Sequence, residues 1–138
     1  MSSSLSQPDE GPSLVTTFLE SLVPEDPAER VEFVDGLVTD CASSTTDMLA
    51  SLRQQGRSRD VEGIRRTAHS FRGASLTLGA PRLAELCRRL EAQAPAEDWP
   101  SLVTLVDEIF HEAEIVDRCL QAFRRDVAGS CGPAGSSE

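Results

Sequence analysis

Aromatic side chains are scarce in this chain: tyrosine is absent, and phenylalanine and tryptophan make up only 4% of the residues. The apolar content is mostly leucine, valine and alanine instead. Aromatic side chains favour strands, whereas leucine and alanine are among the best helix formers. The composition therefore predicts helices packed on helices rather than a sheet.

Long apolar runs are absent as well. No stretch of 18 apolar residues occurs, so we predict no membrane-spanning helix. Residues 1–7 lack the basic and apolar segments of a secretory signal, and we expect a cytoplasmic protein. The four cysteines share no CxxC spacing, and Cys41 and Cys87 fall on apolar stripes, so we expect both to be reduced core residues.

Positive charge is also in short supply, because the formal net charge is −10. Such an excess of acid argues against nucleic acid or an anionic membrane as the main partner. The length of 138 residues and the apolar content of 39% suit one globular domain. Residues 1–11 and 129–138 are rich in Ser, Gly and Pro, and we expect disordered tails flanking a domain over 12–128.

Within that domain, apolar residues recur at the i, i+3, i+4 and i+7 intervals of amphipathic helices. The pattern predicts a short helix near 12–22 and four further helices near 28–55, 60–78, 81–94 and 99–127. Local chemistry marks several ends: Gly56 is expected as a stop, Asp60 or Ser58 as a cap, Gly79 as a stop and Pro81 as a first-turn residue. We predict an all-α antiparallel four-helix bundle with an additional short N-terminal helix.

One residue in the helix expected near 60–78 differs from its surroundings. At about 100° per residue, His69 lies roughly 140° from the middle of the apolar stripe, so we expect it to face solvent. Its nearest neighbours on that face are Arg65, Arg66, Arg72, Gly73 and Leu76. The other histidine, His111, lies opposite its own apolar stripe and outside any HExxH motif, so metal binding gains no support from it.

The groups around His69 suit a nucleophilic imidazole that attacks a phosphoryl group. Arg72, one turn along, can offer forked N–H donors to phosphate oxygens. Gly73 removes a side chain that would obstruct a partner, and Leu76 is an apolar docking contact on the same face. We expect Nε2, the more exposed ring nitrogen, to be the nucleophile.

These residues also carry a family resemblance. The runs AHSFRGASLTLGAPRL at 68–83 and CRRLE at 87–91 resemble the signature of histidine-containing phosphotransfer (HPt) domains. The resemblance implies a small helical bundle that carries a phosphoryl group on one histidine and exchanges it with an aspartate of a response-regulator receiver domain. It also implies His69 as the phosphoacceptor and Arg72 at a position where the family usually has lysine.

Glu91 departs from the family pattern, because some members have a glutamine there that hydrogen-bonds the imidazole. A carboxylate would orient the ring and raise its basicity, but it would also repel a phosphoryl oxygen; whether Glu91 contacts His69 is left open. We expect no metal or cofactor on this chain, with Mg²⁺ only on the partner receiver domain. Six arginines on the two central helices are expected to concentrate positive charge for docking: Arg65, Arg66, Arg72, Arg82, Arg88 and Arg89.

The expected partners are a receiver domain, a hybrid histidine kinase or both, with the chain itself monomeric. No Gly-rich nucleotide loop or acid pair supports an enzyme, and we expect a phosphocarrier without kinase activity of its own. A second hypothesis remains: a bundle of the same fold that docks a receiver or kinase without being phosphorylated. The retained His69 and its cationic neighbour argue against that reading.

Overall fold

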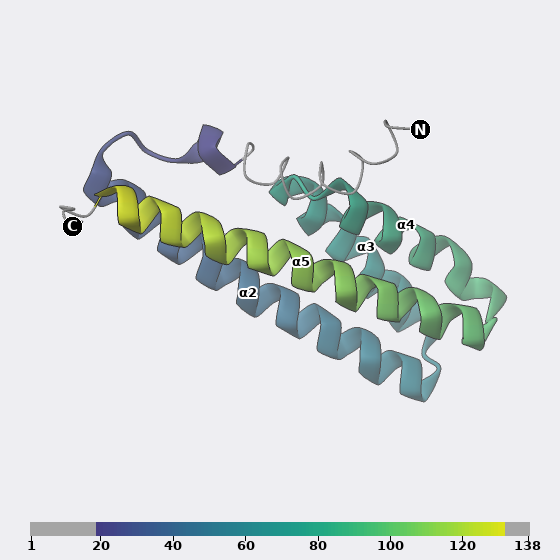
Figure 1. Cartoon of the computed structure of the whole chain (residues 1–138). Coiled ribbons are helices and arrows are strands. Elements are labelled where there is room, and N and C mark those ends of the chain that lie inside the picture. Colours follow the sequence, from purple (N-terminus) through teal and green to yellow (C-terminus); the bar gives the residue numbers. More distant parts are fainter. Residues whose placement is uncertain (1–18, 132–138) are drawn as a thin grey trace, which may run out of the picture.

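The computed structural model describes residues 19–131, and in that part of the chain four long helices form an antiparallel bundle (Figure 1). In chain order these are α2 (Pro27–Ser58), α3 (Val61–Leu78), α4 (Pro81–Gln93) and α5 (Trp99–Cys131), with a short 3₁₀ turn η1 (Ala94–Ala96) before α5. Each helix packs on its two neighbours around the bundle: α2 on α3 and α5, and α4 on α3 and α5. The predicted all-α bundle is therefore confirmed.

Local chemistry sets most helix ends. Asp26 caps α2 by accepting from the Glu29 N–H at 3.1 Å, and Asp60 caps α3 by accepting from the Gly63 N–H at 2.9 Å. Gly79 ends α3 with a φ of 80°, a left-handed conformation that glycine adopts without a Cβ clash. The turns between the helices are short, and they force neighbouring helices to run antiparallel.

Two predicted boundaries were wrong, and a third differs by one residue. Helix α2 runs through Gly56 to Ser58, and it is Arg59, with a φ of 55°, that takes the left-handed cap position. Helix α4 ends at Gln93, one residue early, where η1 begins. Helix α5 continues through Gly129 to Cys131, so residues 129–131 belong to a helix and not to the predicted C-terminal tail.

The N-terminal helix was predicted over 12–22, and the structure describes only its end. Residues 19–22 are helical, and Leu19 is buried in the core. The rest of that prediction, and the tails at 1–11 and 132–138, lie outside the described residues. No helix in the described part of the chain has the length and apolar content needed to cross a membrane.

The core follows the predicted apolar stripes. It is built mainly from leucine, isoleucine, valine and alanine, with two phenylalanines, Phe71 and Phe123. Burying such side chains contributes about 1.5–3 kcal/mol each relative to exposure. Cys87 is fully buried and Cys41 half-buried; both are free thiols, as predicted.

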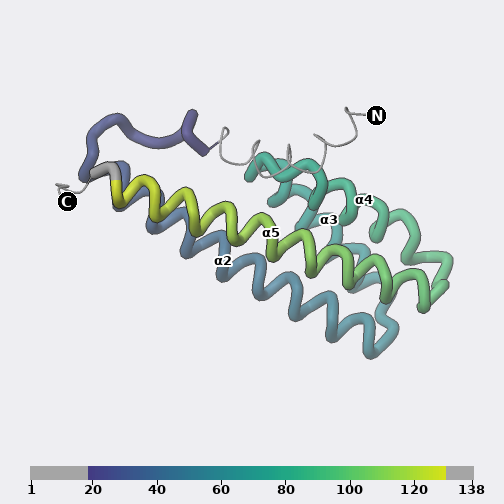
Figure 2. The backbone as a smooth tube through the Cα atoms, viewed as in Figure 1, coloured from purple at the N-terminus to yellow at the C-terminus, as the bar shows by residue number. Residues whose placement is uncertain are grey.

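The two helix pairs differ in length. Helices α2 and α5, of 32 and 33 residues, lie side by side along the molecule, whereas α3 and α4 have only 18 and 13 (Figure 2). The short pair therefore covers only part of the long one. His69 lies on this short pair, near the middle of α3.

Candidate functional site

His69 is held on the outer face of α3 by the packing of its neighbours. Ala68 and Phe71 are buried at 0% and 1% exposure and fix the rotation of the helix about its axis. The His69 side chain is consequently 65% exposed. The predicted outward orientation is therefore confirmed by the geometry.

Glu91 on α4 contacts the imidazole. His69 Nδ1 lies 3.2 Å from Glu91 Oε2 and 3.4 Å from Oε1. A carboxylate can only accept a hydrogen bond from a ring N–H, so this geometry favours the tautomer with the proton on Nδ1. That tautomer leaves the lone pair on Nε2, which has no hydrogen-bond partner among the described residues. The contact that the sequence left open is thus present.

Arg72 lies one turn along α3 from His69 and is about one-third exposed. Its Nη1 is 3.9 Å from Glu91 Oε1, at the outer limit of an ion pair. Glu91 therefore lies between an imidazole and a guanidinium. The cation offsets part of the carboxylate's charge, and the long distance leaves the guanidinium loosely held.

Gly73 adjoins His69 on the exposed face, and nothing in the fold requires a glycine there. A Cβ built at this position would meet no atom within 4 Å. A glycine within a helix costs about 1 kcal/mol relative to alanine. The chain thus carries an unfavourable residue beside His69 without an internal packing reason. Leu76, one turn further, is 58% exposed, as the docking prediction requires.

The six arginines of the predicted basic surface are less free than their sequence spacing suggested. Four of them lie within 4 Å of a glutamate: Arg65 with Glu62, Arg72 with Glu91, Arg82 with Glu112, and Arg88 with Glu85. The Arg88 hydrogen bonds also hold the pKa of Glu85 below its ordinary value. Among the described residues, Arg66 and Arg89 have no carboxylate within ion-pair distance, although Arg89 also helps to lower the pKa of Glu85. The net positive charge around His69 is therefore smaller than predicted.

The pair between Arg82 and Glu112 is one that the sequence did not reveal. Glu112 on α5 is buried at 4% exposure, and its Oε1 lies 3.5 Å from Arg82 Nε on α4. Buried carboxylates need a partner, because their desolvation is costly. The available signal was the position of Glu112 next to the core residue Ala113, at the edge of the apolar stripe.

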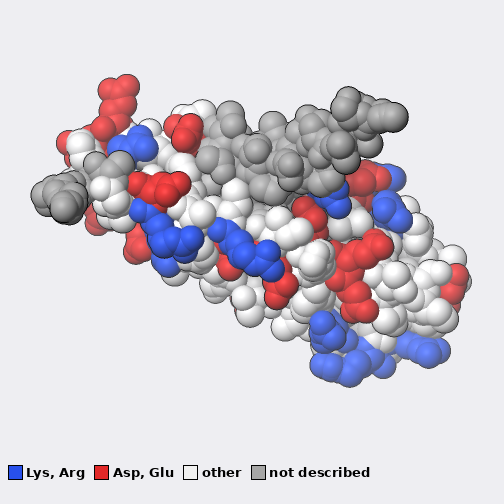
Figure 3. All heavy atoms as spheres, in the orientation of Figure 1, with Lys and Arg blue, Asp and Glu red and all other residues white. Residues whose placement is uncertain are grey.

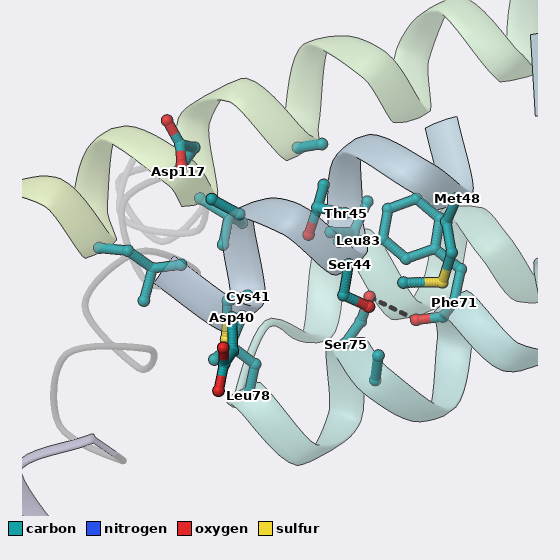
Figure 4. Close-up of a pocket in the computed structure, with 15 residues that line it drawn as sticks. Asp40, Cys41, Ser44, Thr45, Met48, Phe71, Ser75, Leu78, Leu83 and Asp117 are labelled. Atoms are coloured by element: carbon teal, nitrogen blue, oxygen red, sulfur yellow. Dashed lines mark hydrogen bonds between the residues drawn. The ribbon is translucent and has the colours of Figure 1, made fainter. Parts of the chain in front are cut away.

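A half-open, mostly apolar pocket of about 250 Å³ lies between α2, α3 and α5, on the core side of α3 (Figure 4). Phe71 and Ser75 line it from α3, and the Ser75 hydroxyl donates to the Phe71 carbonyl at 2.8 Å, the dashed line in the figure. Phe71 lies about 200° around the helix from His69. The pocket therefore opens onto the core side of α3 and does not communicate with the histidine face.

Within the described part of the chain, no three His, Cys, Asp or Glu side chains are grouped closely enough to hold a metal ion. His111 is exposed on α5. Burial raises the pKa of the Cys87 thiol to about 12 and, together with the nearby Asp40, raises that of Cys41. Neither thiol has the thiolate character of a reactive cysteine.

Comparison with protein families gives a match to the Hpt domain over residues 36–126. The match covers about two-thirds of the chain and includes every residue of the cluster around His69, so the chain belongs to the Hpt domain family. It is a phosphotransfer module of two-component signalling, a class of phosphocarriers rather than kinases, whose partners are receiver domains or histidine kinases.

Among solved structures, the chain is similar to histidine-containing phosphotransfer protein B from Pseudomonas aeruginosa PAO1. The TM-score is 0.64 and the sequence identity 28%, over 81% of this chain and 91% of the other. A search of curated proteins gave no match.

Proposed function

We propose that His69 accepts a phosphoryl group on Nε2 from the phosphoaspartate of a receiver domain and passes it to the aspartate of another. The observation that carries this proposal is the exposed imidazole whose Nδ1 faces the Glu91 carboxylate at 3.2 Å. The contact fixes a nucleophilic nitrogen on the solvent side, and the family supplies the reaction class.

In the proposed step, the Nε2 lone pair forms a bond to phosphorus while the bond from phosphorus to the aspartyl oxygen breaks. The aspartate leaves as a carboxylate, and the Nδ1 proton stays on the ring, which gains positive charge. Glu91 stabilises that charge, as a carboxylate does beside a catalytic imidazole. Its repulsion of the phosphoryl oxygens is reduced by Arg72, 3.9 Å from its Oε1.

Arg72 is proposed to stabilise the phosphoryl group directly. The transition state of phosphoryl transfer is loose and spreads charge over three oxygens, so it benefits mainly from alignment and cations. The weak pairing of Arg72 with Glu91 allows its guanidinium to turn to an incoming phosphoryl group at small cost. The Mg²⁺ ion of the reaction is assigned to the receiver domain, and no cofactor is assigned to this chain.

Docking is assigned to the surface around the histidine. Gly73 admits close approach of the partner's backbone, and Leu76 offers exposed apolar area. Arg66 and the loosely paired Arg72 supply positive charge toward an acidic receiver pocket, whereas Arg65, paired with Glu62 at 2.8 Å, adds little net charge. Charges within about 8–10 Å count most at physiological salt, so this local surface outweighs the distant acidic residues.

The test is transfer from a phosphorylated receiver domain to the purified chain. We expect acid-labile, base-stable label in the wild type, none in His69→Gln, and normal labelling in the matched control His111→Gln. Circular dichroism checks that both variants stay helical. Label that persists in His69→Gln refutes the assignment. A wild type that binds the receiver but never takes label indicates the alternative, a docking module that is not phosphorylated.

The role of Arg72 has its own test. Arg72→Ala should lower the transfer rate about tenfold or more while leaving receiver binding nearly unchanged, because a charge-assisted contact to phosphate is worth about 1.5–3 kcal/mol. Stopped-flow rates at saturating receiver measure the effect. An unchanged rate removes Arg72 from the mechanism.

A further inference from the structure

A second surface lies between the C-terminal end of α2 and the first turns of α5. It is a groove of about 440 Å³, and its lining runs from Leu52 to Arg59 on α2 and from Trp99 to Asp107 on α5. At 1.5 Å per residue these spans are about 10–12 Å long, or two helical turns. Its floor is apolar and includes Ile64, Leu102 and Val106, with the 57% exposed Val103 at the edge.

Three arginines line this groove on the α2 side: Arg53, Arg57 and Arg59. None has a carboxylate partner among the described residues, although the chain has 23 acidic residues for 13 basic ones. The Arg53 guanidinium stacks 4.1 Å from the Phe110 ring centre instead. In Figure 3, basic side chains gather at the lower right, where α2 ends.

Arg59 is held there against the preference of its backbone. Its φ of 55° is left-handed, which a non-glycine residue adopts at a cost, and its N–H closes α2 by donating to the Gln55 and Gly56 carbonyls. Glycine would close the helix in the same way with less strain. The Arg59 guanidinium lies 5.3 Å from the Trp99 ring centre, at the groove. Strain of this kind points to a use for the side chain.

We propose that this groove binds an acidic amphipathic helix of a partner protein. The apolar face of that helix would cover the floor, and its carboxylates would pair with the three arginines, a helix-in-groove arrangement. The groove is flanked over about two turns by α2 and α5, a length along which a partner helix can lie. The arginines, left without carboxylates in an acidic chain, set the charge of the partner.

The groove also lies away from His69. Helix α2 packs on α3 and α5, and α4 packs on the same two helices from the other side, so the α2–α5 seam is opposite the α3–α4 seam. His69 and Glu91 lie on the α3–α4 side. The groove can therefore be occupied while the histidine face is engaged, and the proposal does not depend on the phosphoryl chemistry.

The chain contains a built-in probe for this binding. Trp99 is the single tryptophan of the chain and lines the groove. The chain has no tyrosine whose emission would overlap with that of Trp99. The experiment titrates the full chain with a synthetic 18-residue helical peptide that has leucines on one face and glutamates flanking them. We expect a saturable shift of the Trp99 emission to shorter wavelength, weakened by salt, and much weaker binding of a peptide with glutamine in place of glutamate.

Variants distinguish the groove from unspecific attraction. Arg57→Gln should weaken peptide binding up to about fivefold, as for one exposed ion pair, and the triple change of Arg53, Arg57 and Arg59 to Gln at least tenfold. The matched control Arg125→Gln, an exposed arginine on α5, should bind as the wild type does. Circular dichroism confirms that each variant is folded.

Several outcomes overturn the proposal. One is no emission change at millimolar peptide, and another is equal affinity for the glutamate and glutamine peptides. Unchanged binding by the triple variant does the same. An emission shift that follows chain concentration without peptide, with a dimer in sedimentation, assigns the groove to a second copy instead.

Discussion

Replacing Gly73 by alanine should have opposite effects on the stability of the protein and on phosphoryl transfer from a receiver. A Cβ at Gly73 meets nothing within 4 Å, so the fold gains the full helix preference of alanine, about 0.8–1 kcal/mol. For a domain of this size the gain corresponds to a rise in melting temperature of about 4 °C. If a receiver domain packs closely against residue 73, the added methyl group overpacks that interface at a cost of about 1–3 kcal/mol. The rate of transfer from the receiver should then fall by about fivefold to a hundredfold.

Gly63, on the same helix, is the matched control. A Cβ there would strike the Asp60 carboxylate that caps α3 and approach Gln55 Cδ at 3.0 Å. Loss of the cap costs about 1 kcal/mol and cancels the preference for alanine. We therefore expect Gly63→Ala to be no more stable than the wild type and to transfer normally.

Urea unfolding and receiver-dependent labelling of both variants measure the two effects. The informative pattern is Gly73→Ala more stable yet slower, and Gly63→Ala not stabilised yet unimpaired in transfer. If Gly73→Ala transfers at the wild-type rate, the glycine does not serve partner approach. If Gly73→Ala is not more stable than the wild type, the space around a Cβ at position 73 is not open.

Three further predictions concern single side chains. Glu91→Gln keeps an acceptor for His69 Nδ1 without the charge, and should slow labelling less than Glu91→Leu, for which we expect about a tenfold to hundredfold loss; equal rates in all three proteins would remove Glu91 from the site. Arg82→Gln should lower the free energy of unfolding in urea by about 1–3 kcal/mol, because Glu112 is left buried without its cation, and the double variant with Glu112→Gln should regain part of that loss; an unchanged stability would contradict the buried pair. Burial raises the pKa of Cys87 to about 12, whereas an unfolded thiol ionises near its ordinary value, so the unfolded state loses a proton that the folded state keeps. Stability that is complete below about pH 8.5 should therefore fall by up to about 1.4 kcal/mol per pH unit toward pH 12. The chain has neither lysine nor tyrosine to titrate in that window, and Cys87→Ala under reducing conditions should flatten the slope; an equal slope in both proteins refutes the assignment.

The sequence predicted those features that depend on one helix at a time. His69, Arg72, Gly73 and Leu76 follow from positions on a single helical face, and the ends of α3 follow from Asp60 and Gly79. The boundary at Gly56 failed because the left-handed cap falls on Arg59, a residue that backbone preference disfavours. The Arg59 side chain packs on Trp99, and this contact accompanies a left-handed backbone conformation that local propensity does not predict.

Side-chain contacts between two helices could not be predicted from the sequence. The contact of His69 with Glu91 depends on how α3 and α4 are placed against each other, and the pair of Arg82 with Glu112 on how α4 meets α5. Spacing along the chain carries no such distance. The same limit explains why the six arginines near His69 were counted as free positive charge.

The attraction of a partner to each surface of this molecule therefore depends on which arginines are paired with carboxylates, and not on the net charge of the chain. The net charge of −10, taken alone, would disfavour an acidic partner, but it does not describe the local surfaces. Several arginines of α3 and α4 are offset by glutamates, and Arg89 faces the first turns of α5, so attraction near His69 depends on Arg66 and the loosely held Arg72. The arginines of the α2–α5 groove stack on rings or remain unpaired, and they keep their charge for a ligand. Since screening limits each charge to about 8–10 Å, the two surfaces act separately, and salt should weaken both without coupling them.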